Sequence, residues 1–178
     1  LLIQDVSIFA LAHLAEIRDS ETGNHLRRTK GYVRCLAQGL REHPRFAHEL
    51  DDKKIELLVK SAPLHDIGKV GIRDDILRKP GKLSADEWVI MKTHAALGAA
   101  AIEDAEREVP QKVAFLDIAK QIARHHHERW DGKGYPDGLA GDDIPLAARL
   151  MALADVFDAL ISRRVYKEPF PVEQARSM

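Results

Sequence analysis

The pentapeptide HDIGK, residues 65–69, constrains the fold of this chain more than any other stretch. It follows a segment, residues 52–64, in which apolar side chains recur at helical spacing. His65 and Asp66 are therefore expected on a buried face at the end of a helix. An imidazole nitrogen and a carboxylate oxygen together suit a first-row divalent metal. Because buried charge is costly without a partner, further polar groups should converge on this pair from elsewhere in the chain.

The rest of the chain shows the same helical spacing and no convincing strand alternation. The HDIGK helix is predicted to run from about residue 52 to 67, to bend at Pro63 and to stop at Gly68, with Lys69 at the turn. Ser84 and Glu87 are spaced as a capping box that opens a helix. Further helices are predicted over residues 1–18, 25–40, 84–109, 113–127 and 146–161, with loops at 70–83 and 128–144. We therefore predict an all-α fold, a bundle of about six to seven helices around a metal site.

Size and composition fit one intracellular domain. The 178 residues can bury a sizeable core. A net charge of -1 argues against a general DNA-binding protein. A single cysteine excludes a thiolate metal cluster, and we expect a cytoplasmic location and no membrane span. The chain starts inside a helical pattern, so we interpret residues 1–178 as a domain cut from a longer protein with an upstream regulatory domain.

Two aspartates stand out in the otherwise apolar helix predicted over residues 146–161. Apart from Arg149, its only charged residues are Asp155 and Asp158. Aspartate is a poor helix former and is rarely buried without a partner. Either these aspartates form salt bridges with arginines, or they bind metal. With the histidines considered, we favour a metal-ligand role for Asp155.

Histidines supply the other candidate ligands. Three consecutive residues of a helix spread over about 200°, so His125, His126 and His127 cannot all reach one centre. His126 and His127 stack over apolar residues one turn earlier and should point inward, whereas His125 should be solvated. His94, taken alone, would be interpreted as a core histidine, and it becomes a candidate ligand only as part of the set. Trp88 is interpreted as a packing residue.

Glu21 and His25 are spaced i, i+4, so both side chains could reach one point in space. A carboxylate and an imidazole would suit an additional, third metal ion. Alternatively, Glu21 only caps a helix N-terminus, where negative charge is favourable, and His25 binds one of two metals.

The motifs, taken in order, resemble those of HD-GYP domains, a branch of the HD superfamily of metal-dependent phosphohydrolases. The matching segments are RDSETGNHLRR, LHDIGKVGI, KPGKLSADEW, MKTH, HHERWDGKGYPDGLAG and ADVFDALISRRVYK. The GYP tripeptide is residues 134–136. The resemblance covers nearly the whole chain, although HD-GYP domains usually extend one or two helices further.

The resemblance implies hydrolysis of cyclic di-GMP to linear pGpG, and from there to GMP, by a hydroxide that bridges two metals. It implies two or three divalent transition-metal ions, iron or manganese. Its metal ligands correspond to Glu21, His25, His65, Asp66, His94, His126, His127 and Asp155. Its substrate contacts correspond to Asp19, Lys69, Tyr135, Asp158, Arg164 and Lys167. We assign catalytic roles to Asp66 and Lys69.

Two alternatives remain. The chain could be another HD-type phosphohydrolase acting on a nucleotide, although the GYP loop and the RRVYK segment argue against this. It could also be a cyclic-dinucleotide sensor with little activity, or a module that docks a protein partner through the GYP loop. Loss of metal ligands would mark such a sensor, and none of the ligand positions is lost here.

Overall fold

The computed structural model describes residues 2–19, 24–162 and 168–177. Within these ranges all regular structure is helical, and the β contacts amount to an isolated bridge between Asp131 and Ala140. The all-α prediction is confirmed. The α-helices are α1 (Leu2–Arg18), α2 (His25–Leu40), α3 (Asp52–Ser61), α4 (Asp74–Leu77), α5 (Ala85–Arg107), α6 (Ala114–His125), α7 (Leu146–Ile161) and α8 (Val172–Arg176). The short 3₁₀ helices are η1 (Ala62–Leu64), η2 (Ile67–Gly71) and η3 (Gly141–Asp143).

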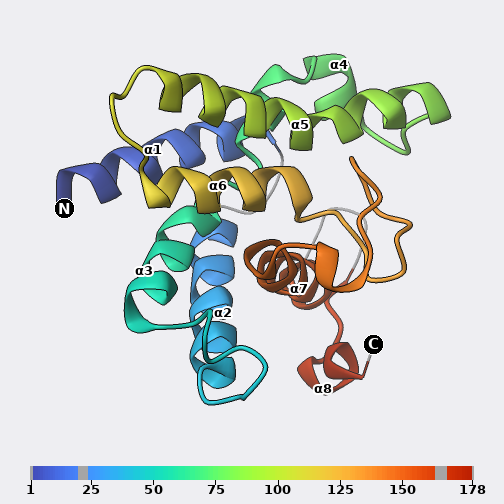
Figure 1. Cartoon of the computed structure of the whole chain (residues 1–178). Coiled ribbons are helices and arrows are strands. Elements are labelled where there is room, and N and C mark those ends of the chain that lie inside the picture. Colours follow the sequence, from blue (N-terminus) through green and yellow to red (C-terminus); the bar gives the residue numbers. More distant parts are fainter. Residues whose placement is uncertain (1, 20–23, 163–167, 178) are drawn as a thin grey trace.

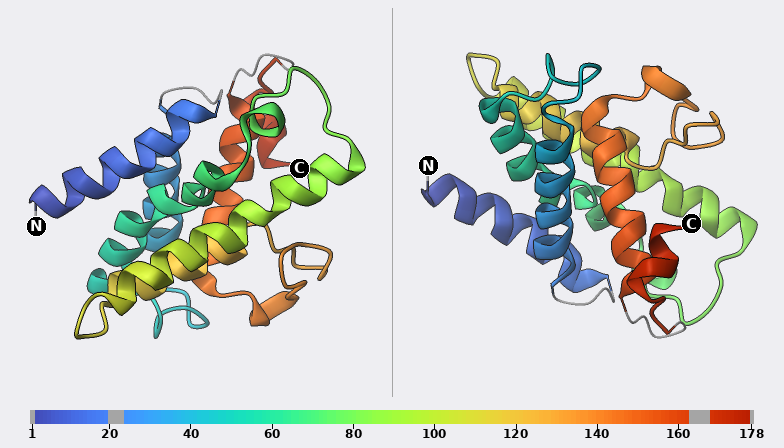
Figure 2. Two further views of the ribbon diagram at one scale, coloured as in Figure 1. Left: turned by 90° about the horizontal axis from the view of Figure 1, so that it is seen from above. Right: turned by 90° about the horizontal axis from the view of Figure 1, so that it is seen from below.

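The long helices form two groups that cross each other (Figure 1). Helices α5 and α6 lie side by side, with η2 against α5. Helix α2 packs on α3 and α7 and runs across the direction of α6 (Figure 1). The N-terminal part of α1 projects from this body (Figure 2). No helix among the described residues is both long and apolar enough to cross a bilayer.

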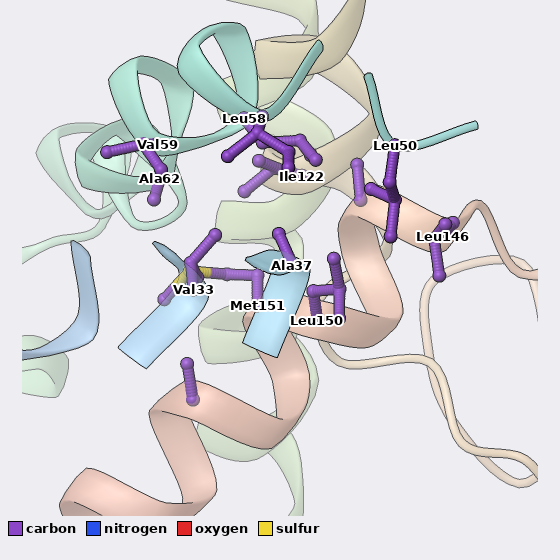
Figure 3. Close-up of a cluster of buried hydrophobic side chains, with 13 residues drawn as sticks. Val33, Ala37, Leu50, Leu58, Val59, Ala62, Ile122, Leu146, Leu150 and Met151 are labelled. Atoms are coloured by element: carbon purple, nitrogen blue, oxygen red, sulfur yellow. The ribbon is translucent and has the colours of Figure 1, made fainter. Parts of the chain in front are cut away.

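The largest apolar cluster joins α2, α3, α6 and α7 (Figure 3). Val33 of α2, Val59 of α3, Ile122 of α6 and Met151 of α7 are each at most 2% exposed. Burying a side chain of this size stabilises a fold by about 1.5–3 kcal/mol. This packing fixes the relative positions of the four helices that carry, or lead into, the predicted metal ligands.

The HDIGK segment differs from the predicted continuous helix. Helix α3 ends at Ser61, and residues 62–64 tighten into η1. Pro63 has no backbone N–H and its ring crowds the preceding turn, which accounts for the end of the α-helix before it. His65 and Asp66 form the turn between η1 and η2.

Gly68 has a different role from the predicted helix stop. It lies inside η2, and a Cβ there would be 2.0 Å from the backbone oxygen of His94 and 2.4 Å from the nitrogen of Gly98. Both distances are well below van der Waals contact. Only glycine therefore allows η2 to lie directly on α5, which brings the turn holding His65 and Asp66 next to His94.

Other boundaries agree closely with the sequence analysis. The capping box is confirmed, because the backbone N–H groups and side chains of Ser84 and Glu87 form both of its hydrogen bonds. The predicted loop at 70–83 contains the end of η2 and the short helix α4. The loop at 128–144 contains η3.

Candidate metal centre

Seven histidine and aspartate side chains converge where η1, η2, α2, α5, α6 and α7 meet. They form two groups, and within each group one ligand atom per residue lies within 4.8 Å of all the others. The first group is Asp66, His94, His126 and His127, and the second is His25, His65 and Asp155. All seven were predicted as ligands from the sequence, and the structure brings them together.

Asp66 lies between the two groups. Its Oδ1 is 3.3 Å from Nε2 of His94 and 3.6 Å from Nε2 of His126. Its Oδ2 is 3.3 Å from Nε2 of His65, which belongs to the second group. A carboxylate that directs one oxygen to each of two sets of nitrogen ligands has the arrangement needed to bridge two cations.

The second group places two imidazole Nε2 atoms face to face. Nδ1 of His25 donates to Oδ2 of Asp158 at 2.8 Å, and Nδ1 of His65 donates to the Ala62 carbonyl at 3.0 Å. With Nδ1 protonated, Nε2 is the atom of each ring that offers a lone pair to a metal when the ring is neutral. These two Nε2 atoms are 3.3 Å apart, and Nε2 of His25 is 3.6 Å from Oδ1 of Asp155. A cation between them would satisfy all three atoms.

The rings of the first group are oriented by nearby backbone. Nδ1 of His94 donates to the Met91 carbonyl at 2.7 Å, and Nδ1 of His126 donates to the Ile122 carbonyl at 2.9 Å. Such hydrogen bonds fix the tautomer and make Nε2 the more basic ligand atom. The helices that carry these histidines thus also orient them.

Three atoms at the centre of the first group are buried and form no hydrogen bond within the described chain. They are Oδ1 of Asp66, Nε2 of His94 and Nε2 of His126. Leaving a buried polar atom unpaired costs roughly 1–3 kcal/mol, and all three face one another. The donor set and its unpaired atoms therefore fit a bound divalent cation.

The electrostatics of the protein alone agree with this interpretation. Burial lowers the pKa of His126 and of His127, so both rings stay neutral and able to bind metal. Burial would also lower the pKa of His65, but the adjacent Asp66 outweighs it and raises that pKa to about 9. Without a metal, a proton on His65 thus provides positive charge beside Asp66. Burial would raise the pKa of Asp66, but Lys69 and His65 hold it well below its usual range.

Two predicted substrate-binding residues lie on one side of the metal ligands. Nζ of Lys69 is 2.7 Å from Oδ2 of Asp66 and 2.7 Å from Oδ2 of Asp19. A small cavity beside them is lined by Asp19, Lys69, His25 and His65 among others. Lys69 is therefore placed to contact a group bound at the metals.

Tyr135 of the GYP tripeptide covers another side. Its ring centroid is 4.7 Å from that of His127 and 6.3 Å from that of His94. Burial raises its pKa, so the phenol is neutral and can donate a hydrogen bond. Gly134 is required before it, because a Cβ at that position would lie 2.4 Å from the Cα of Glu128.

Glu128 is a structural residue of the GYP loop that the sequence analysis missed. Its buried carboxylate accepts hydrogen bonds from the backbone N–H groups of Asp137 at 2.7 Å, Gly138 at 3.1 Å and Leu139 at 3.1 Å. It therefore ties the segment after the GYP tripeptide to the end of α6. No motif signals this contact, since its partners are backbone groups.

Asp158 is paired with Arg28, an arginine that the sequence analysis did not identify although it left a salt bridge with an arginine open for Asp158. Arg28 donates from Nε and Nη2 to the two oxygens of Asp158, at 2.6 and 2.9 Å. Asp158 is 1% exposed and also holds His25. Of the two interpretations offered for these aspartates, the salt bridge with an arginine holds for Asp158. Its carboxylate contacts Nδ1 of His25, and Nε2 of His25 faces the other ligands. The predicted contact of Asp158 with substrate stays a prediction.

His125 was predicted to be solvated, and this is wrong. Its side chain is 15% exposed, and Nδ1 lies 3.4 Å from Oδ2 of Asp137. Helix α6 ends at His125, and the GYP loop folds back over it. His125 belongs to neither of the two groups above and lies instead with Glu128 and Asp137 in a third set of possible ligands. That His126 and His127 bind metal and His125 does not stays a prediction.

Three predicted site residues, Glu21, Arg164 and Lys167, lie outside the described residues. The other predicted residues all lie at the two ligand groups or next to them.

The family model for the HD domain matches residues 10–178, and the chain belongs to that family. Membership implies divalent-metal binding, which the two ligand groups could provide. Two similar proteins of Vibrio cholerae are named a probable cyclic di-GMP phosphodiesterase, 58% identical over 99% of this chain, and a cyclic di-GMP phosphodiesterase, 54% identical over 98%. A third, 43% identical over 95%, is named a 3′3′-cGAMP-specific phosphodiesterase 2. The chain spans 40%, 35% and 30% of these relatives, respectively.

Proposed function

We propose that this chain is a metal-dependent phosphodiesterase that hydrolyses cyclic di-GMP to linear pGpG. The observation that carries the proposal is the position of Asp66, with one oxygen toward His94 and His126 and the other toward His65. In this position Asp66 would hold two cations, and a pair of metal ions would support in-line displacement at phosphorus. The names of the 58% and 54% identical relatives support the choice of substrate.

The metals, when bound, supply a nucleophilic water of lowered pKa and offset charge on the phosphoryl oxygens. The chain supplies the rest. Lys69, on the side of Asp19, provides a positive charge for a nonbridging phosphate oxygen. Tyr135 provides a neutral phenol beside His127 and His94, able to donate to an oxygen of the substrate. Arg164 and Lys167 are proposed, from the resemblance, to bind the second phosphate.

The direct test is hydrolysis of cyclic di-GMP by protein loaded anaerobically with iron or with manganese. We expect pGpG as the first product, with GMP following if the linear dinucleotide binds again. Because a relative at 43% identity is named for 3′3′-cGAMP, that dinucleotide should be assayed in parallel. Metal-loaded protein that binds cyclic di-GMP without cleaving it would instead establish the sensor alternative.

The number and identity of the metals are part of the proposal. The two ligand groups support two ions, with His25 in the second group beside His65 and Asp155. Iron or manganese suits imidazole and carboxylate ligands. A third ion would need Glu21. Glu21→Ala should lower the metal content of fully loaded protein by one ion per chain if that third ion exists, and leave two ions unchanged if Glu21 only caps a helix.

Two further predictions concern the setting of the domain. The relatives are longer than this chain, and an upstream regulatory domain stays a prediction from the sequence. A protein partner at the GYP loop and a cytoplasmic location remain predictions from the sequence.

A further inference from the structure

A row of three aromatic rings in contact extends from the metal ligands to the protein surface. It begins at His127, continues to Tyr135 at 4.7 Å and ends at Trp88, whose ring centroid is 6.4 Å from that of Tyr135 at an interplanar angle of 80°. Trp88 is 47% exposed. It was interpreted as a packing residue, yet half of its surface remains in water beside the candidate site.

A lysine, Lys92, lies beside these rings. Lys92 lies one turn after Trp88 on α5, and its Nζ is 5.8 Å from the centre of the Tyr135 ring. The same helix carries His94, so Trp88 and Lys92 are held rigidly relative to the metal ligands. An exposed aromatic face next to a lysine is the combination that holds a nucleobase, because the base stacks on the ring while its acceptor atoms meet the charge.

We infer that Trp88 and Lys92, together with Tyr135, form a purine-binding subsite for one base of the dinucleotide substrate. The inference rests on the proposed function and extends it to two residues with no assigned role. In this subsite the base stacks on Trp88. Nζ of Lys92 faces the O6 and N7 acceptors of guanine, the edge that lysine contacts in guanine recognition. The diester bound at the metals and its base are thus held by different parts of α5.

The subsite is tested by comparing two substrates that share a phosphodiester but differ in bases. One is cyclic di-GMP, and the other is bis(p-nitrophenyl) phosphate, which has no purine. Trp88→Ala should raise the KM for cyclic di-GMP about tenfold, the loss expected for one base–aromatic stack. Its kinetics with bis(p-nitrophenyl) phosphate should match wild type. Lys92→Met, which keeps an apolar stem, should act in the same direction with a smaller effect.

Trp130 offers a matched control. It is 59% exposed and stands between Arg45 and Arg149, whose guanidinium carbons are each 5.9 Å from its ring centre. Trp130→Ala removes the same type of side chain, from the GYP loop, but no member of the subsite. It should leave both KM values unchanged. Trp88→Phe, which keeps an aromatic face, should recover most of the affinity lost in Trp88→Ala.

A binding measurement keeps the inference separate from the proposed activity. In Trp130→Phe protein Trp88 is the single tryptophan, and titration with cyclic di-GMP should quench its fluorescence saturably. If cyclic di-GMP is cleaved but Trp88→Ala leaves its KM unchanged, the subsite is wrong and the proposed function stands. Equal losses with both substrates would also overturn the subsite, since Trp88 would then be structural. If only bis(p-nitrophenyl) phosphate is cleaved, the proposed function fails, and the presence or absence of quenching decides the subsite.

Discussion

The two ligand groups are oriented in different ways. In the first group, His94 and His126 donate to carbonyls three and four residues earlier in their own helices. In the second group, His25 is oriented by Asp158, which lies 133 residues away in the chain and is itself held by Arg28. His65 of the second group is also oriented locally, by the Ala62 carbonyl. The groups therefore differ in His25, whose orientation depends on the packing of α2 against α7.

Burial does not separate the groups. His94 and His126 are each 2% exposed, His25 and His65 are 3% and 0% exposed, and the Asp66 and Asp155 side chains are each 20% exposed. The difference lies in how the rings are oriented, and a ligand oriented by its own backbone needs little reorganisation to bind a metal. We therefore expect the first group to hold its ion more tightly, and the second to lose its ion first under a limiting chelator.

The largest effect is expected where the two groups meet. Asp66→Ala removes the one carboxylate that faces both of them, so both sites should lose affinity together. Hydrolysis should fall at least about a thousandfold, since the positioning and charge stabilisation by two metals are lost at once. Elemental analysis and a cyclic di-GMP assay on the same preparation would check this. A variant with wild-type metal content and turnover would contradict the bridging role.

A second prediction separates the first group from its neighbours in sequence. His126→Ala removes one of four ligands and should lower activity about a hundredfold or more, with loss of the ion from that group. His125→Ala is the matched control, because His125 faces Asp137 and belongs to neither group. It should keep most activity. Similar severe losses in both variants would show that the assigned orientation of the α6 terminus is wrong.

The contrast between the groups also explains what the sequence could reveal. Helical periodicity predicted the all-α fold and the inward direction of His126, because both depend on local geometry. Two aspartates in an otherwise apolar helix, considered with the histidines, pointed to Asp155. The 3₁₀ geometry at the HD turn was missed, since it depends on how closely Gly68 approaches the backbone of α5.

Contacts between residues far apart in the chain were the hardest to predict from the sequence. Nothing in the sequence assigned Arg28 to a particular partner, and only the packing of α2 on α7 brings it to Asp158. Glu128 binds backbone N–H groups, which carry no residue-type signal. Residues that support a ligand from a distant part of the chain thus escape sequence reasoning, whereas the ligands themselves do not.

A third prediction tests the dependence of the second group on Asp158. Asp158→Asn keeps the size of the side chain but removes the charge that orients His25. Loss of such a supporting partner typically costs 10–100-fold in metal affinity. The second group should weaken by about this factor while the first group is unchanged. Calorimetric titration of metal-free protein with Mn²⁺ should then show one altered and one unaltered binding step. Equal weakening of both steps would contradict the prediction that Asp158 supports the second group alone.

The smallest effect is expected one residue further from the metal. Burial would raise the pKa of Asp158, but its hydrogen bonds with His25 and Arg28 lower that pKa to about 2. Arg28→Met removes one of these two partners and leaves the contact with His25 in place. Asp158 then stays ionised near neutral pH and still accepts the hydrogen bond from His25. It is, however, no longer held in place by Arg28. We expect a few-fold weakening of the second metal site, less than in Asp158→Asn.

Arg27→Met is the control for Arg28→Met, since Arg27 is exposed and lies over the ring of Phe9 rather than near the ligands. It removes the same charge from the same helix. Both variants should retain the first metal site, and only Arg28→Met should shift the second binding step in the Mn²⁺ titration. If the two variants weaken that step equally, the effect comes from the overall charge of α2, and the chain of contacts from Arg28 through Asp158 to His25 does not tune the metal.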